Sequence, residues 1–301
     1  MRIVSVLPSA TEIVCALGAR AELVGRSAEC DFPAEIREVP VVMRPRTLDA
    51  DQPSSAIDAR VREARGRDES LYTIDVATLR KARPDVLLTQ DLCGVCSVTS
   101  EEVTAACRQA AVDPSIVSLS PRTLEEVWRS VETVGVAIGR ADEGRRLASE
   151  ARRRSAKTVL PRPCRVAVVE WLDPPILAGL WTPAIVEAAG ATAVGPAPGT
   201  PGERTGWERL RELGPDVVVL SPCSFSVART LAELEAPALA ARVRASVPAQ
   251  ATFVADEAYF SRPGPRLVHG IDLVRALARG APVPSAMPVQ RWSLDRLEAA
   301  A

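Results

Sequence analysis

Four cysteines follow segments that read as buried strands, where thiolates could bind a soft metal. Cys30, Cys93 and Cys96 come after strand-like segments of the first half, and Cys223 follows the matching segment of the second half. Thiolates placed in this way could hold zinc or another thiophilic metal, or ligate the metal of a bound chelate. Small thiols that pack against strand ends explain the same pattern, because a single Cys-x-x-Cys pair is weak evidence. A metal site at Cys30, Cys93 and Cys96 is therefore one of two interpretations.

A second set of residues, aromatic and polar, lies in loops after predicted strands. Trp171, Trp181 and Tyr259 offer flat apolar surface for a macrocycle, and aromatic residues make up only 4% of the chain. The polar and thiol-bearing candidates for ligand binding are Ser9, Thr11, Glu29, Cys30, Gln90, Asp91, Cys93 and Arg262. Each of these residues has an alternative role that does not involve a ligand. The tryptophans could pack in a hydrophobic core, Ser9 or Thr11 could cap the N-terminus of a helix, and Arg262 could stabilise its own loop.

Residues for catalysis are scarce. The only histidine, His269, lies in an amphipathic run from Arg266 to Ala278. Serine-nucleophile motifs and glycine-rich phosphate loops are absent from the sequence, and one histidine cannot form a zinc-hydrolase cluster. We therefore expect a protein that is not an enzyme and needs no catalytic cofactor.

Composition bounds the partners and the compartment. The 301 residues are 47% hydrophobic and carry a net charge of −1, which gives no electrostatic reason to bind nucleic acid. The first residues, Met1 to Leu7, read as a buried strand that stops at Pro8, unlike the apolar core of an export signal. Seven cysteines, an odd number, suit a reducing compartment. These features predict a cytoplasmic monomer that binds a small molecule.

The two halves of the chain repeat the same order of elements. A strand leads into a helix that ends at a glycine, over residues 8–18 in the first half and 182–190 in the second. A short strand, a helix, a Pro-Asp turn and a buried strand follow, ending with residues 79–88 and 210–220. This alternation is typical of parallel sheets covered by helices. It predicts an α/β fold of two similar lobes with mainly parallel sheets.

Between the repeats, apolar residues recur at helical spacing. Leu124, Val127, Val131 and Val134 predict a long helix that bridges the lobes within residues 122–160, although Gly139 allows a break. The N-terminal lobe then covers residues 1–121, with a polar insertion at about 44–70, and the C-terminal lobe covers 161–301. Because ligands bind at the carboxyl ends of parallel strands, we expect the ligand to contact the loops that follow those strand ends.

Several phrases spread over most of the chain resemble the class III solute-binding proteins of vitamin B12 and ferric-siderophore uptake, in particular their B12-binding branch. The phrases are Leu7-Pro8-Ser9-Ala10-Thr11-Glu12, Glu29-Cys30-Asp31-Phe32-Pro33, Arg83-Pro84-Asp85-Val86, Thr89-Gln90-Asp91-Leu92-Cys93, Gly179-Leu180-Trp181-Thr182-Pro183 and Ala258-Tyr259-Phe260-Ser261-Arg262-Pro263. Taken together they are specific, although each alone is weak. The resemblance implies two α/β lobes bridged by a long helix, with the ligand held between them.

The resemblance also implies a ligand and a partner. The ligand would be cobalamin or a related corrinoid, and the partner would be the permease of an ABC transporter, which contacts one acidic residue on each lobe. Glu101 and Glu208 fall near those positions, where first-turn helix residues are the simpler interpretation. Glu29, Gln90 and Glu170 stand near positions that are aromatic in B12 receptors. A binder of a metal, haem or a ferric siderophore, or a cysteine-dependent metalloprotein, is the alternative.

Overall fold

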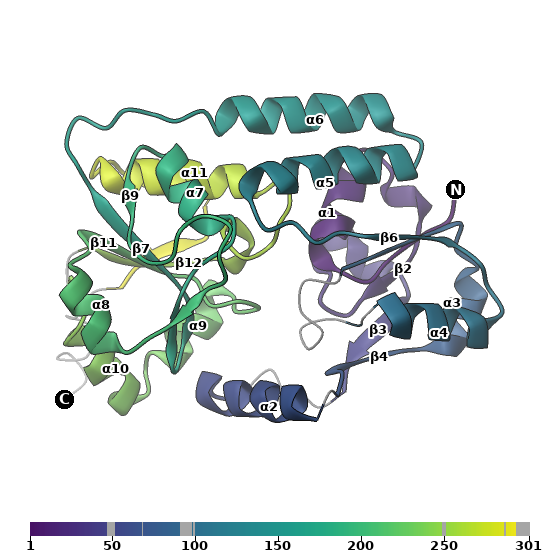
Figure 1. The fold of residues 1–301 in the computed structure, drawn as a ribbon, viewed down its shortest axis with the longest axis horizontal. Helices are drawn as coiled ribbons and strands as arrows, with labels where there is room; N and C mark the ends of the chain where they lie inside the picture. The colour runs from purple at the N-terminus through teal and green to yellow at the C-terminus, as the bar shows by residue number, and fades with distance from the viewer. Residues whose placement is uncertain are drawn as a thin grey trace. The chain divides into compact units, whose positions relative to one another are not determined.

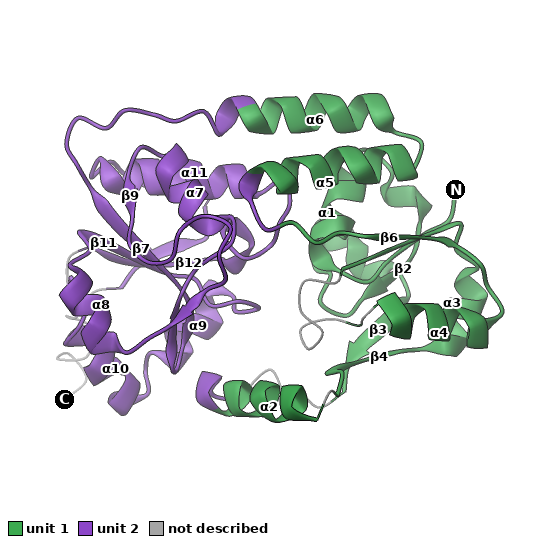
Figure 2. Ribbon diagram, in the orientation of Figure 1, with its two compact units in different colours: residues 1–52, 56–121, 125–152 green, residues 53–55, 122–124, 153–301 purple. Residues whose placement is uncertain are grey.

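The computed structural model describes residues 1–46, 52–67, 69–90, 98, 100–248, 251–285 and 287–292. The chain divides into two compact units, coloured separately in Figure 2. Unit 1 comprises residues 1–52, 56–121 and 125–152, and unit 2 comprises residues 53–55, 122–124 and 153–301. Each unit is built around its own sheet, so each is described by itself.

Unit 1 contains a sheet in the order β4-β3-β2-β1-β5-β6. Its strands are β1 (Ile3–Ser5), β2 (Leu23–Ser27), β3 (Val41–Pro45), β4 (Tyr72–Ile74), β5 (Val86–Thr89) and β6 (Ser115–Ser118). All neighbouring pairs are parallel except β3 with the edge strand β4. The central strands β1 and β5 are buried throughout, as expected where helices cover both faces of a parallel sheet.

Helices α1 (Pro8–Ala16), α3 (Val76–Ala82) and α4 (Ser100–Ala110) of unit 1 lie between successive strands of its sheet, and α5 (Leu124–Ala137) and α6 (Ala141–Arg154) follow the last strand (Figure 1). The 3-10 turns η1 (Arg20–Glu22) and η2 (Ala34–Glu38) belong to the same unit. The polar helix α2 (Ser54–Gly66) lies within the predicted insertion, between β3 and β4. Its first two residues, Ser54 and Ser55, are grouped with unit 2, where the backbone and hydroxyl of Ser54 donate to Glu233 at 2.7 and 2.6 Å.

Unit 2 contains a sheet in the order β10-β8-β7-β11-β12-β13, and β9 also pairs with β7. Its strands are β7 (Arg165–Leu172), β8 (Pro175–Leu177), β9 (Thr192–Ala193), β10 (Glu203–Arg204), β11 (Val217–Leu220), β12 (Thr252–Ala255) and β13 (Val289–Arg291). Strands β9, β7, β11 and β12 run parallel, and the outer strands are antiparallel.

Helices pack on both faces of this second sheet (Figure 1). They are α7 (Thr182–Ala188), α8 (Trp207–Leu213), α9 (Val227–Glu233), α10 (Pro237–Arg244) and α11 (Leu267–Ala278), with the 3-10 turn η3 (Glu257–Tyr259). The core beneath α8 and α10 joins Trp207 and Leu239 to Val218 of β11. The prediction of an α/β fold with parallel central strands is confirmed.

The repeated Pro-Asp turn has the same structural role in both units. In unit 1, Asp85 accepts a hydrogen bond from the backbone of Arg2 at 2.7 Å, just before β1. In unit 2, Asp216 accepts one from the backbone of Arg165 at the same distance, at the start of β7. Each aspartate thus satisfies a donor at the amino edge of the sheet and aligns two parallel neighbours. The repeated Pro-Asp sequence therefore reflects a hydrogen bond that aligns two parallel strands in each unit.

The segment expected to bridge the lobes as a long helix is divided into α5 and α6, which lie side by side. Gly139, with φ of 70°, ends α5 in a conformation that few other residues adopt, and the chain turns back. Gly135 and Gly144 let the two backbones touch, since a Cβ at Gly135 would lie 3.0 Å from the Cα of Gly144. Arg152 of α6 then pairs with Glu125 and Glu132 of α5 at 2.8 and 2.6 Å.

None of the helices in the described ranges has the length and apolar character needed to cross a bilayer.

We expect Gly135→Val to destabilise the α5–α6 pair by about 2 kcal/mol or more, because backbone atoms of Arg140 and Gly144 leave no room for a side chain. Thermal unfolding followed by circular dichroism would measure the loss. Gly66→Ala is the matched control, since open space surrounds Gly66 and its helix should be unaffected or slightly stabilised. Equal unfolding midpoints for Gly135→Val and the wild type would contradict the proposed close packing.

Candidate functional site

At the carboxyl edge of the unit 1 sheet, the polar residues of α1 face inward. The hydroxyl of Thr11 donates to Ser5 at 2.9 Å and lies 3.1 Å from the sulfur of Cys30. Ser9, Thr11 and Cys30 are all buried. Neither hydroxyl caps α1, because Leu7 occupies the N-cap position without a side-chain hydrogen bond. The N-cap interpretation of Ser9 or Thr11 is therefore wrong, and Thr11 instead ties α1 to β1 and to the loop after β2.

The other unit 1 candidates divide into two groups. Glu29 and Gln90 are half-buried, at the ends of β2 and β5. Beside Gln90, the hydroxyl of Thr89 is buried and has no hydrogen-bond partner among the described residues. The remaining candidates, Asp91, Cys93 and Cys96, lie outside the described residues. Within the described ranges, no group of three or more histidine, cysteine, aspartate or glutamate side chains is placed to hold a metal ion.

Glu170 lies in β7 of unit 2, in a narrow space between two glycines. The backbone N–H of Gly179 donates to its carboxylate, and a Cβ at Gly202 would collide with its Oε1 atom. A side chain at Gly179 would likewise strike the backbone of residues 200–202. Burial of Glu170 raises the pKa of its carboxyl to about 7, although the Gly179 hydrogen bond opposes the shift. Near neutral pH this group is protonated in about half of the molecules.

Trp171, the next residue, belongs to an aromatic cluster that the sequence reasoning did not identify in full. Its ring centroid lies 5.4 Å from that of Phe225 at an interplanar angle of 55°. The guanidinium of Arg229 lies 4.5 Å from the centroid of Phe225 and pairs with Glu233 at 3.2 Å. The indole N–H of Trp171 is buried and lacks an acceptor in the described part of the chain. Phe225 lies five residues after β11, at a strand end, and this position in the sequence could have identified it as a candidate.

Trp181 is buried and braces the loop that follows η3. Its indole nitrogen donates to the carbonyl of Phe260 at 2.6 Å, and Thr182 donates to the same oxygen at 3.3 Å. Tyr259 is also buried, with its ring centroid 5.8 Å from that of His269. Core packing, one of the two roles left open for the tryptophans, thus describes Trp181 well. Its ring presents little surface to a ligand.

Arg262 and Cys223 belong to a charged cluster at this edge of the unit 2 sheet. Arg262 forms an ion pair with Glu257, and both side chains are largely buried. Solvent reaches Cys223 on one side, but the surrounding protein removes much of its hydration. This desolvation, together with the negative charges of Glu257 and Glu170, raises the pKa of the thiol to about 12. Cys223 is therefore a neutral thiol at physiological pH.

Glu101 and Glu208, the residues expected to contact a transporter, are exposed in the first turns of α4 and α8. That position favours a carboxylate through the helix dipole in any case. Their role in docking stays a prediction.

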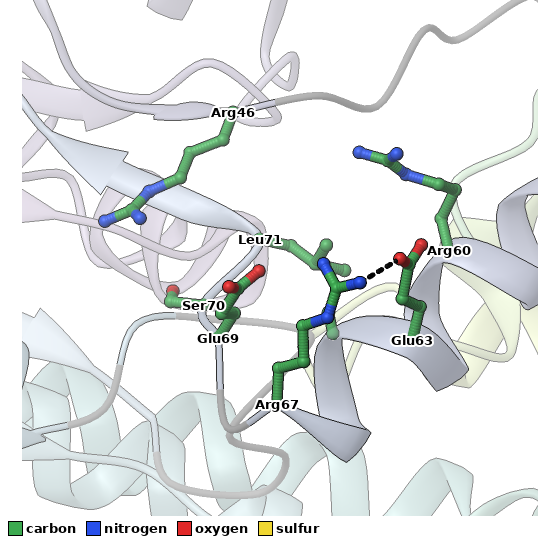
Figure 3. A pocket seen from close by; sticks show the side chains of 8 residues that line it. Arg46, Arg60, Glu63, Arg67, Glu69, Ser70 and Leu71 are labelled. Carbon is green, nitrogen blue, oxygen red and sulfur yellow. Dashed lines mark ion pairs between the residues drawn. The ribbon is translucent and has the colours of Figure 1, made fainter.

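A separate pocket of about 130 Å³ lies in unit 1 near the end of α2 (Figure 3). Its charged lining consists of Arg46, Arg60, Glu63, Arg67 and Glu69. Arg67 pairs with Glu63 at 2.8 Å, as the dashed line in Figure 3 shows. Pockets that enclose ligands of drug size or larger measure roughly 300–1,000 Å³ and are mostly apolar. This pocket is too small and too polar to enclose a macrocycle.

Trp181→Ala should cost about 3–5 kcal/mol of folding stability, because it empties a large buried volume and removes the brace on Phe260. Trp181→Phe keeps most of the volume and should cost about 1 kcal/mol for the lost hydrogen bond. Urea unfolding followed by far-ultraviolet circular dichroism would measure both. A loss below 1 kcal/mol for Trp181→Ala would show that the side chain is not part of the core.

Glu170→Gln should remove a pH dependence of stability. The pKa of Glu170 is about 7 in the folded protein and near 4.5 when unfolded, so the folded state holds an extra proton between these values. Stability therefore falls as pH rises from 4.5 to 7, by roughly 3.5 kcal/mol at 1.4 kcal/mol per pKa unit. Thermal unfolding midpoints at pH 5 and pH 8 should differ less in Glu170→Gln than in the wild type. The same difference in both proteins would exclude this carboxyl as the cause.

No family model matches this sequence, and no curated protein matches it significantly. Solved structures do match. A periplasmic heme binding protein from Pseudomonas aeruginosa superposes with a TM-score of 0.67 and 19% identity, over 95% of each chain. The periplasmic vitamin B12 binding protein BtuF of Vibrio cholerae gives a TM-score of 0.59 and 19% identity, over 92% of this chain and 96% of its own. An ABC-type Fe3+-hydroxamate transport protein from Saccharomonospora viridis gives 0.62 and 18%, over 92% of both chains.

These similarities correct one prediction and support another. The expected cytoplasmic location is wrong, because the proteins that share this architecture are named as periplasmic. An export signal is a short segment outside the folded units, so the strand-like residues at the start of β1 carry no information about the compartment. The resemblance inferred from the sequence phrases agrees with the structural similarity. The chain has the fold of the periplasmic solute-binding proteins for haem, vitamin B12 and ferric hydroxamates.

Proposed function

We propose that this protein binds a cobalamin-like corrinoid, with contacts from the carboxyl edge of the unit 2 sheet, and that it takes no part in catalysis. The observation that carries the proposal is the chemistry around Glu170 and Trp171 in unit 2. Trp171 is half-buried and packs on the buried ring of Phe225, and it directly follows Glu170, whose carboxyl is often protonated near neutral pH. The surface that Trp171 and Glu170 provide is apolar and hydrogen-bonding, and it carries little net charge.

Hydrogen-bonding groups in unit 2 suit the amide side chains of a corrin ring. The indole N–H of Trp171 has no partner among the described residues. Buried donors in native proteins are nearly always satisfied, so an unpartnered one at a strand end is a reason to expect a ligand acceptor nearby. A protonated Glu170 adds a second donor in the same strand. Carbonyl oxygens of amide arms would satisfy both.

Haem is the alternative ligand, because proteins named as haem-binding have this fold. Its two propionates call for cationic partners. At the unit 2 edge, Arg262 is paired with Glu257 and Arg229 with Glu233, so the nearby positive charges are already balanced. Anionic ferric siderophores would also need cationic partners, and the same two arginines are already paired with glutamates. The balance of charge favours a ligand whose polar groups are neutral.

An ABC transporter permease is the partner that this function would need. Glu101 and Glu208 stand exposed at helix starts, one in each unit, where they are accessible to arginines of a partner. We propose them as the docking residues on that basis.

The purified protein should bind one cyanocobalamin per chain, as measured by equilibrium dialysis and visible absorbance. Haemin and ferric enterobactin, which are both anionic, should bind at least about tenfold more weakly under the same conditions, because neither matches the neutral hydrogen-bonding surface. Binding of cyanocobalamin should weaken from pH 6 to pH 8 as Glu170 loses its proton. Tight binding of haemin without binding of any corrinoid would reject the proposal.

Trp171→Phe tests the surface itself. It keeps an aromatic ring and removes the unpartnered N–H, and we expect roughly a three- to tenfold loss of cyanocobalamin affinity. Trp128→Phe is the matched control, since Trp128 is buried within α5 and should affect stability alone.

A further inference from the structure

Arg26, at the end of β2, is a buried arginine with an unusual set of partners. Only 8% of its surface is exposed, and its guanidinium donates to backbone carbonyls alone. The acceptors are Ser27 at 2.9 Å, Cys30 at 3.2 Å, Arg37 at 3.0 Å, Val39 at 3.1 Å and Ala28 at 3.4 Å. No carboxylate pairs with it in the described ranges. A charge buried in this way is tolerated only because carbonyl dipoles surround it.

These carbonyls belong to both ends of the connection between β2 and β3. One side chain therefore holds the start of the loop, residues 27–30, against its return, residues 37–39. The planar guanidinium carries five N–H donors in a fixed array, which suits several carbonyls at once. Lysine has three donors around a single point and could not reproduce the set.

A second group of contacts fixes the same loop from the inside. The Cys30 sulfur lies 3.1 Å from the hydroxyl of Thr11, and the Cys30 backbone N–H donates to Ser27 at 3.1 Å. Ala28 donates to Met43 of β3 at 2.8 Å. Cys30 is consequently buried, with 1% of its surface exposed. The loop 28–33 is held at three points before it meets any ligand.

The outward side of this loop carries Phe32, which is 46% exposed. Single exposed apolar side chains are common on protein surfaces and need no explanation alone. Phe32, however, is the only aromatic among the large apolar side chains that stand exposed in the described part of the chain. It also follows a parallel strand at its carboxyl end, where ligands of such sheets bind. An aromatic ring on a prearranged loop contributes affinity without the cost of ordering that loop on binding.

We propose that Arg26 is a positioning residue that holds the loop 28–33 in place, and that Phe32 is the side chain that this loop presents to the ring face of a corrinoid. The inference rests on the proposed function and extends it to unit 1. Arg26 acts through the loop and does not touch the ligand. Phe32 supplies the contact.

Cyanocobalamin affinity of Phe32→Ala gives the first test. We expect a roughly tenfold loss with an unchanged unfolding midpoint, because the exposed ring contributes little to the core. Val136→Ala is the matched control, since Val136 is 67% exposed on α5 and should alter neither quantity. Wild-type affinity in Phe32→Ala would overturn the assignment of this residue.

Arg26→Lys gives the second test, with a readout that needs no ligand. Iodoacetamide labelling of Cys30, followed by mass spectrometry, should be at least about fivefold faster in the variant, because the loop opens more often. Its affinity for cyanocobalamin should also fall by several-fold. Labelling and affinity that both match the wild type would overturn the role of Arg26.

The double variant Arg26→Lys/Phe32→Ala separates positioning from a general loss of structure. If Arg26 acts through Phe32, the double variant should bind no more weakly than the weaker single variant. Fully additive losses would show that Arg26 affects binding by another route. If the wild type binds no corrinoid, the proposed function fails and the contact role of Phe32 fails with it, whereas Cys30 labelling still decides whether Arg26 holds the loop.

Discussion

Parallel pairing of buried central strands is the constraint on which the rest of this structure depends. In unit 1, β1 lies between β2 and β5, and in unit 2, β7 lies between β9 and β11. Strands that run in one direction bring all their carboxyl ends to one edge of the sheet, and the loops from these ends carry the candidate binding residues. The aspartates of the Pro-Asp turns secure the opposite edge, through Arg2 and Arg165. Alignment at one edge thus determines which residues meet at the other.

The two units use different physical means to prepare their carboxyl edges. Unit 1 relies on hydrogen bonds, since Arg26 and Thr11 hold the loop that carries Cys30. Unit 2 relies on close packing around Glu170, where Gly179 and Gly202 leave no space for a side chain. Both arrangements remove conformational freedom before a ligand arrives, so less entropy is lost on binding. The same contacts explain why Arg26, Thr11 and Glu170 are tolerated although they are largely buried.

Charge around the unit 2 edge is the basis on which we propose one ligand class over the others. Proteins that share the fold are named for haem, vitamin B12 or ferric hydroxamate, so the architecture serves several chemistries. Here Arg229 beside Phe225 is paired with Glu233, Arg262 is paired with Glu257, and Glu170 is partly protonated near neutral pH. These local features, and not the topology, provide the reason to favour a neutral, amide-bearing macrocycle.

The sequence alone determined the α/β class, the two similar units, the order of their elements and the polar insertion, because these follow from local periodicity and turn chemistry. It also placed Glu170, Trp171 and Arg262 near strand ends. Tertiary structure decided what each side chain does there: Trp181 is buried against Phe260, Arg262 is paired with Glu257, and α5 turns back on α6. The role of Arg26 was also invisible, because its acceptors are backbone carbonyls up to 13 residues away. Such partners depend on how the chain packs in three dimensions, and no local pattern of residue types records them.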